Sequence, residues 1–125
     1  MIRVVLFEDN KNLRESLALY LSGTEGIWFS GAFPNAKEAW PLIKKHKPDV
    51  VLMDIQMPRM DGHEAVRTLR RMEYAKPIIA LTAHAMREEQ ERTRLSGFTE
   101  FLSKPIDKKA LISTIAKHSH SKARF

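Results

Sequence analysis

The chain has 125 residues, enough for one domain with a buried core and too few for two. It contains no cysteine, which excludes disulfides and thiolate metal sites, and no apolar stretch reaches the length of a membrane span. The net charge is +6, and residues 61–125 carry 13 basic and 8 acidic side chains against 8 and 7 in residues 1–60. Because these basic residues alternate with glutamate and no aromatic side chains interleave with them, we expect a solvated surface and no direct nucleic-acid binding.

The first part of the chain predicts two strands separated by a helix. The continuous apolar run from Ile2 to Phe7 is typical of a strand buried on both faces of a parallel sheet. Three leucines at intervals of four residues, from Leu13 to Leu21, share one helix face, and Gly23 can end that helix in a left-handed conformation. Ile27 to Phe29 is a shorter apolar run and predicts an edge strand.

A second helix is expected from about Ala36 to His46, with Asn35 and Glu38 spaced as in a capping box. Pro41 falls inside this segment and cannot donate a backbone hydrogen bond to the Lys37 carbonyl. In a regular helix interior this costs about 3 kcal/mol. We therefore expect either a kink near Trp40 or a helix that starts late.

Two further apolar runs, Val50 to Met53 and Ile78 to Leu81, predict two more buried strands. The segment from Met86 to Leu95 has helical spacing but is nearly all polar, so we expect it to pack lightly. The remaining elements are a helix after Gly62 bearing Ala65, Val66 and Leu69, a short edge strand within Phe98 to Leu102, and a helix capped by Asp107 that bears Leu111, Ile112 and Ile115.

Five strands that alternate with five helices predict an α/β domain with a doubly wound, five-stranded parallel sheet. In such sheets ligands bind at the carboxyl ends of the strands, near the point where the strand order reverses. The polar residues that follow the apolar runs are therefore expected to gather at one end of the sheet.

Three of these polar residues are carboxylates: Glu8 and Asp9 close the first apolar run, and Asp54 closes the third. Buried like charges raise one another's pKa, so a fold that gathers three of them usually does so for a cation. Carboxylate oxygens suit a hard ion such as Mg2+. Thr82 and Lys104 follow two other strands and would add a hydroxyl and an ammonium to the same sheet end. Together these groups predict a phosphoryl-binding site.

In this pattern the chain resembles the receiver domain of two-component response regulators, and the receivers attached to hybrid sensor kinases, over essentially its whole length. The resemblance rests on four features that occur in order at matching distances: Glu8-Asp9, the segment from Met53 to Gly62, the segment from Ala80 to Ala85, and Lys104-Pro105. It implies a flavodoxin-like sheet in the order 2-1-3-4-5 and a cis peptide before the proline. It also implies a receiver domain over residues 1–117, followed by a basic tail at 118–125.

The resemblance makes Asp54 the phosphoacceptor, which takes a phosphoryl group from a phosphohistidine. Asp9 and Asp54 would bind Mg2+ directly, Gln56 would add its backbone carbonyl, and Glu8 would act largely through water. Charge develops on the oxygens of the transferring group, so positioning and cation neutralisation supply most of the catalysis.

The resemblance also implies how the phosphoryl group is held and sensed. Lys104 would pair with one phosphoryl oxygen, and Thr82 would donate its hydroxyl to another, helped by the backbone N–H of Ala83. Phe101 would be the switch aromatic, which swings inward as Thr82 moves toward the phosphoryl group. It lacks the hydroxyl that many relatives carry there, so its outward position cannot be held by that hydrogen bond.

These inferences predict a signalling switch operated by phosphorylation, with slow self-dephosphorylation, rather than an enzyme with an external product. The implied cofactor is Mg2+, and the implied phosphodonor is a histidine kinase or a histidine phosphotransfer protein. An output domain, a protein partner or a homodimer formed on phosphorylation would carry the signal. We expect a cytoplasmic location with no membrane contact.

Other functional classes make different demands on the sequence. A haloacid-dehalogenase-like phosphatase needs a second acid two residues after its nucleophile, where this chain has Gln56. An FMN-binding flavodoxin needs hydroxyls and backbone donors after the first strand, where Glu8-Asp9 would repel a bare phosphate. The alternatives to a phosphorylated receiver are an interaction module that works without phosphorylation and a basic nucleic-acid-binding domain.

The histidines give little support for a zinc site. His118 and His120 are two residues apart and do not share a helix face, and the chain offers no cysteine as a further ligand. His84 and Gln56, each two residues after a predicted site residue, occupy positions that in relatives affect how water reaches the phosphoryl group.

Overall fold

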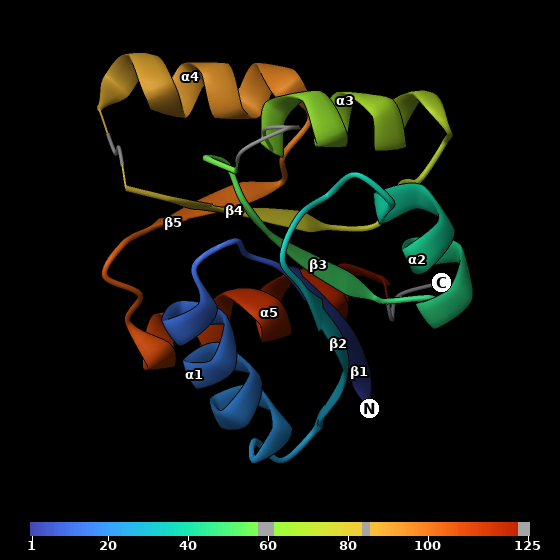
Figure 1. Cartoon of the computed structure of the whole chain (residues 1–125), viewed down its shortest axis with the longest axis vertical. Helices are drawn as coiled ribbons and strands as arrows, with labels where there is room; N and C mark the ends of the chain where they lie inside the picture. Colours follow the sequence, from blue (N-terminus) through green and yellow to red (C-terminus); the bar gives the residue numbers. More distant parts are fainter. Residues whose placement is uncertain (58–61, 84–85, 123–125) are drawn as a thin grey trace.

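Five parallel strands form one sheet in the order β2-β1-β3-β4-β5, and five helices alternate with them along the chain (Figure 1). The computed structural model describes residues 1–57, 62–83 and 86–122, with side chains described as far as Ser119. The predicted fold class and strand order are confirmed. The strands are β1 (Ile2–Phe7), β2 (Ile27–Phe33), β3 (Val50–Asp54), β4 (Ile78–Thr82) and β5 (Glu100–Ser103), and the helices are α1 (Lys11–Ser22), α2 (Ala39–His46), α3 (Gly62–Arg71), α4 (Arg87–Ser96) and α5 (Lys108–Lys122).

Helices cover the sheet on both faces, which explains why its central strands are continuous apolar runs. Every residue of β3 and β4 is buried. On one face, alternate side chains of the strands pack against α2 and α3, and α4 lies beside α3 (Figure 1). On the other face the sheet packs against α1 and α5. No helix in the described part of the chain is long and apolar enough to cross a membrane.

The ends of α1 differ from the expectation in one respect. Asn10 caps the N-terminus, since its Oδ1 accepts the Leu13 N–H at 2.9 Å, so neither Glu8 nor Asp9 is used as the cap. Gly23 closes the helix as predicted, but with φ −92° it is not left-handed. Its N–H reaches the Leu19 and Tyr20 carbonyls, both at 3.2 Å, and this tightened last turn needs no left-handed residue.

The second helix starts late, as Pro41 predicts. It begins at Ala39, which places Pro41 in the first turn, where a backbone N–H has no partner within the helix. The predicted capping box is wrong for the same reason. Asn35 Oδ1 accepts the Lys37 N–H at 3.0 Å in a turn that precedes the helix, and the Glu38 side chain makes no capping hydrogen bond.

We expect Pro41→Ala to change the free energy of unfolding by less than about 1 kcal/mol, because proline in a first turn removes no hydrogen bond and mainly stiffens the unfolded chain. Lys44→Pro, three residues further along the same helix, should cost about 3 kcal/mol. Urea unfolding of both variants measures the difference. Equal losses would contradict the assignment of Pro41 to the first turn.

The edge elements also differ in extent from the sequence prediction. β2 continues to Phe33, beyond the expected Phe29, and its pairing with β1 shifts register after Val4. β5 lies at the opposite edge, as expected. The polar helix α4 has only Thr93 and Ser96 as buried residues, which confirms that it packs lightly.

Arg70, near the end of α3, joins three chain segments through one half-buried guanidinium. Nε donates to the Gly97 carbonyl at 2.9 Å, and one terminal nitrogen donates to the Tyr74 and Lys76 carbonyls at 2.7 and 2.8 Å. Burial lowers the pKa of Arg70. These bonds connect the end of α3, the approach to β4 and the C-terminal end of α4.

Candidate phosphoacceptor and metal site

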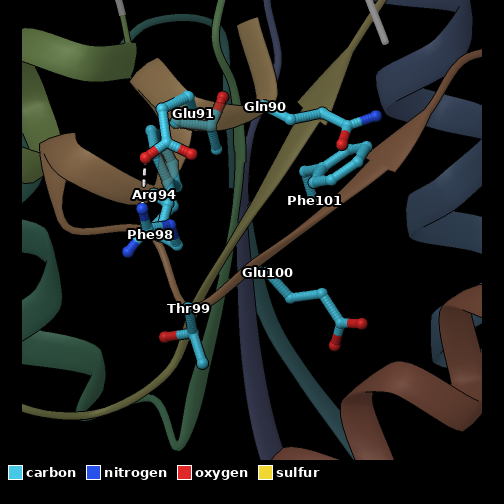
Figure 2. Close-up of a pocket in the computed structure, with 8 residues that line it drawn as sticks. Gln90, Glu91, Arg94, Phe98, Thr99, Glu100 and Phe101 are labelled. Atoms are coloured by element: carbon cyan, nitrogen blue, oxygen red, sulfur yellow. Dashed lines mark hydrogen bonds and ion pairs between the residues drawn. The ribbon is translucent and has the colours of Figure 1, made fainter. Parts of the chain in front are cut away.

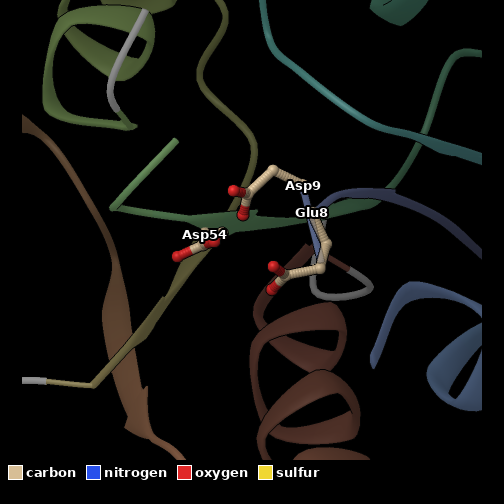
Figure 3. A group of neighbouring side chains, drawn as sticks. All are labelled: Glu8, Asp9 and Asp54. Carbon is tan, nitrogen blue, oxygen red and sulfur yellow. The ribbon is translucent and has the colours of Figure 1, made fainter. Parts of the chain in front are cut away.

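The three predicted carboxylates meet at the carboxyl end of the sheet (Figure 3). Phe7 of β1 lies beside Met53 of β3, so the residues that follow them emerge together. One carboxylate oxygen from each of Glu8, Asp9 and Asp54 lies within 4.8 Å of the others. Glu8 is 0% exposed and Asp54 is 1% exposed, while Asp9 faces solvent. The cluster is therefore open to an ion or a partner on one side only.

Backbone hydrogen bonds fix the orientation of the two buried carboxylates. Asp54 Oδ1 accepts the Gln56 N–H at 3.0 Å, and Glu8 Oε2 accepts the Asn10 N–H at 3.1 Å. From α1, an Arg14 guanidinium nitrogen donates to the Glu8 carbonyl at 2.9 Å and to the Asp9 carbonyl at 3.3 Å. The loop that carries the acidic pair is thus held from the first turns of the helix after it.

Lys104 brings a positive charge into the cluster. Its Nζ lies 3.2 Å from Glu8 Oε1 and 3.3 Å from Asp54 Oδ2. The Lys104 N–H donates to the Thr82 carbonyl at 2.7 Å, and the peptide bond to Pro105 is cis, as expected. One ammonium faces three carboxylates, so the cluster remains negative when all three are ionised.

This arrangement perturbs the carboxyl groups in opposite directions. Burial, together with hydrogen bonds to Glu8 and Asp9 and the charge of Glu8, raises the pKa of Asp54 to about 8. Burial also acts to raise the pKa of Asp9, but hydrogen bonds with Asp54 and Glu8 outweigh it, and the pKa of Asp9 is lowered. Without a cation, the cluster therefore keeps a proton on Asp54 near neutral pH.

The residues present fit a hard divalent cation. They offer carboxylate oxygens and no sulfur or imidazole, which is the ligand set that Mg2+ prefers. Glu8 Oε1 is buried and has no hydrogen-bond partner, although Lys104 lies close enough for an ion pair. A cation would neutralise the repulsion that raises the pKa of Asp54.

The other predicted site residues lie on β4 and β5 and in the segments that follow β3 and β4. Thr82 ends β4 and is 1% exposed, Ala83 follows it at the surface, and the Gln56 side chain is exposed. Phe101 pairs with Ala80 in the sheet and is half-buried. Figure 2 shows its ring beside the Gln90 side chain in a groove of about 280 Å³ between α4 and β5. The predicted position His84 lies outside the described residues.

Sequence reasoning missed Asn10 as the cap of α1 and Arg14 as the support of the acidic pair. Asn10 has a local signal, because asparagine just before a helix is a common cap. Arg14 has none, since its contacts depend on how the loop folds back on the helix.

Comparisons with known proteins agree with the resemblance to receiver domains. The profile of the family described as "Response regulator receiver domain" matches residues 4–116. The chain is 34% identical over 117 residues to an uncharacterised 14.6 kDa protein of Leptolyngbya boryana, covering 92% of this chain and 88% of that one. It is 39% identical over 113 residues to the transcriptional regulatory protein PdtaR of Mycobacterium tuberculosis, covering 90% of this chain but only 54% of PdtaR.

Solved structures give the same result. The signal receiver domain of the putative response regulator NarL from Mycobacterium tuberculosis superposes with a TM-score of 0.88 at 27% identity, covering 95% of this chain and 96% of that one. A second match is the receiver domain of Ssk1 from Saccharomyces cerevisiae, which was solved with the histidine phosphotransfer signalling protein Ypd1. It superposes with a TM-score of 0.86 at 26% identity, covering 98% of this chain and 91% of that one. The chain belongs to the response regulator receiver domain family, whose members are phosphoacceptors in two-component signalling rather than conventional enzymes.

Proposed function

We propose that Asp54 receives the phosphoryl group and that its loading operates the switch. A carboxylate oxygen of Asp54 attacks the phosphorus of a phosphohistidine, the P–N bond breaks, and the imidazole leaves with the electron pair. The product on this chain is an acyl phosphate, which water later hydrolyses to restore the carboxylate. The observation that carries this proposal is the position of Asp54, a buried strand-end carboxylate beside two other carboxylates and a lysine.

The neighbouring residues have distinct proposed roles. Lys104, now paired with Asp54 and Glu8, would move to an oxygen of the arriving phosphoryl group. The Thr82 hydroxyl and the Ala83 N–H would donate to another oxygen. Phe101 would follow the movement of Thr82 and change the groove between α4 and β5.

We propose Mg2+ as the cation of this site, held by Asp9, Asp54 and the backbone carbonyl of Gln56, with Glu8 acting through water. When bound, it neutralises charge on the carboxylates and on the transferring phosphoryl oxygens. By holding Asp54 ionised, the site keeps its nucleophile in the reactive form.

The phosphodonor in this proposal is a histidine kinase or a histidine phosphotransfer protein, supported by the likeness to the receiver domain solved with Ypd1. An output domain, a protein partner or a second copy would read the phosphorylated state. The cytoplasmic location and the division into residues 1–117 and a tail at 118–125 stay predictions. In the structure α5 continues to Lys122.

Incubation with acetyl phosphate tests the proposal. We expect Mg2+-dependent formation of an acyl phosphate, which hydroxylamine converts to a hydroxamate on the peptide that contains Asp54. EDTA should block the reaction, and Asp9→Asn should raise the Mg2+ concentration that half-maximal loading needs by about tenfold or more. Modification that maps to another residue, or that is indifferent to EDTA, would disprove the proposed site.

A further inference from the structure

A groove of about 410 Å³ lies at the end of the sheet opposite the carboxylate cluster, at the first residues of β1 and β2. Parallel strands run from this end toward the site, so the groove is separated from Asp54 by the length of the sheet (Figure 1). Its volume is within the range of pockets that take small molecules or single anchoring side chains. The groove is lined by Met1, Arg3, Trp28, Ser30, Lys45 and His46.

Neighbouring residues of β1 and β2 form one side of the groove. Arg3 and Trp28 are direct neighbours across the β1–β2 pair, so their side chains leave the same face of the sheet. The adjacent residues Ile27 and Phe29 point to the opposite face and pack in the core with α1 and α5. Trp28 is 59% exposed, an unusual state for the largest apolar side chain in a sheet that helices cover on both faces.

The rim of the groove is cationic. Lys45 and His46 come from the last turn of α2, and Arg3 comes from β1. Within the described ranges no carboxylate pairs with the Arg3 or Lys45 side chain. Asp49, whose carboxylate accepts the Arg3 backbone N–H, forms an ion pair with Lys76 at 3.4 Å. The groove therefore places two cationic side chains beside an exposed tryptophan.

The imidazole of His46 is fixed in place. Its Nδ1 lies 2.7 Å from Ser30 Oγ, and its ring packs against Phe33 at a centroid distance of 5.6 Å. This wall joins α2 to β2 at the register shift of the strand, so the groove does not depend on a mobile loop. A preformed wall reduces the entropy that a bound segment has to overcome.

We propose that this groove is a docking site for an acidic segment of a partner protein, in which carboxylates flank one apolar or aromatic residue. The apolar residue would contact Trp28, and the carboxylates would pair with Arg3 and Lys45. Tryptophan and arginine dominate the energetics of many protein interfaces, and charge complementarity selects the partner. The register shift in β2 makes this edge a poor template for an added strand, so side chains rather than backbone pairing carry the recognition.

The test uses the full chain and a fluorescein-labelled peptide in which six glutamates flank one phenylalanine. Anisotropy should show binding with a dissociation constant of about 0.1 to 1 mM at low salt, weakening as salt is added. The same peptide with glutamines in place of glutamates should bind at least about tenfold more weakly. Amide chemical-shift changes should map to the first residues of β1 and β2 and the end of α2.

Matched variants separate the groove from general surface properties. Trp28→Thr and the double variant Arg3→Gln with Lys45→Gln should each weaken binding by about tenfold or more. Leu19→Thr changes another exposed apolar residue, and Arg71→Gln with Lys109→Gln removes the same amount of charge elsewhere, so both controls should bind as the parent does. Asp54→Asn should also bind normally, and the groove variants should still load phosphate, which keeps this test independent of the phosphoacceptor assignment.

Three outcomes would overturn the proposal. One is that the parent chain shows no binding at about 2 mM peptide. Another is tighter binding of a single-stranded oligonucleotide of equal charge, which would assign the surface to nucleic acid. The third is a dimer, detected by sedimentation, that disappears in Trp28→Thr and would show that a second copy fills the groove.

Discussion

Replacing Asp54 with asparagine is expected to abolish phosphoryl loading, with a loss of about a thousandfold or more. The amide has nearly the shape of the carboxylate and can still accept the Gln56 N–H, but it is not a nucleophile and cannot form an acyl phosphate. Loading is measured as hydroxylamine-sensitive phosphate after incubation with acetyl phosphate and Mg2+. The folded structure should be retained, because asparagine has nearly the volume of aspartate and removes no packing contact at this buried position.

Asp107→Asn provides the matched control. This residue caps α5 through its Oδ1, which accepts the Lys109 and Ala110 N–H groups, and asparagine caps as well as aspartate. The control should load at the parental rate. Acyl phosphate that persists in Asp54→Asn at that rate would place the acceptor on another residue.

The stability of the metal-free protein is expected to fall as the pH rises from about 4 to about 8. In the folded chain the pKa of Asp54 is raised from 3.8 to about 8, so the folded state holds a proton that the unfolded state has released. Stability therefore decreases with pH across this window, because the native state binds more protons. The protonated Asp54 contributes its full stabilisation below its pKa in the unfolded chain, 3.8, and this stabilisation is lost as the pH rises through its pKa in the folded chain, about 8.

Thermal unfolding in EDTA at a series of pH values measures this effect. Between about pH 4 and pH 8 the free energy of unfolding should fall by an amount on the order of a few kcal/mol, which corresponds to a fall in Tm of roughly 5 °C or more. Asp54→Asn should flatten the slope and be more stable than the parent near pH 8. Mg2+ should oppose the loss at high pH, because it binds the ionised carboxylates. A parent and an Asp54→Asn variant with identical pH profiles would contradict the raised pKa of Asp54.

The sequence predicts the central strands of this fold because a strand that is buried on both faces has apolar residues at every position. Val50 to Met53 and Ile78 to Leu81 are continuous apolar runs only because helices cover both sides of the sheet. The carboxylate cluster follows from the same logic, since parallel strands that end together bring the residues after them together. The candidate site could therefore be located without knowledge of the helices that surround it.

The remaining features depend on contacts that leave no local signal. Ser30-Gly31 is typical of a turn, yet β2 continues through it, because a register shift against β1 accommodates the extra residue. The capping box at Asn35 and Glu38 was locally reasonable, but Pro41 determines where α2 can begin. The three carbonyls bound by Arg70 come from segments whose proximity only the tertiary fold creates.

The Arg70 contacts also hold the C-terminal end of α4. Both buried residues of this helix, Thr93 and Ser96, lie toward its C-terminal end, next to the Gly97 carbonyl that Arg70 holds. Ser96 is bound there by His63, whose Nδ1 lies 2.7 Å from its hydroxyl. The same imidazole also reaches the other end of the helix, because its Nε2 lies 3.9 Å from the carboxylate of Glu89 in the first turn of α4. One buried histidine of α3 therefore contacts both the first and the last turn of α4, so any displacement of this lightly packed helix has to change those two contacts.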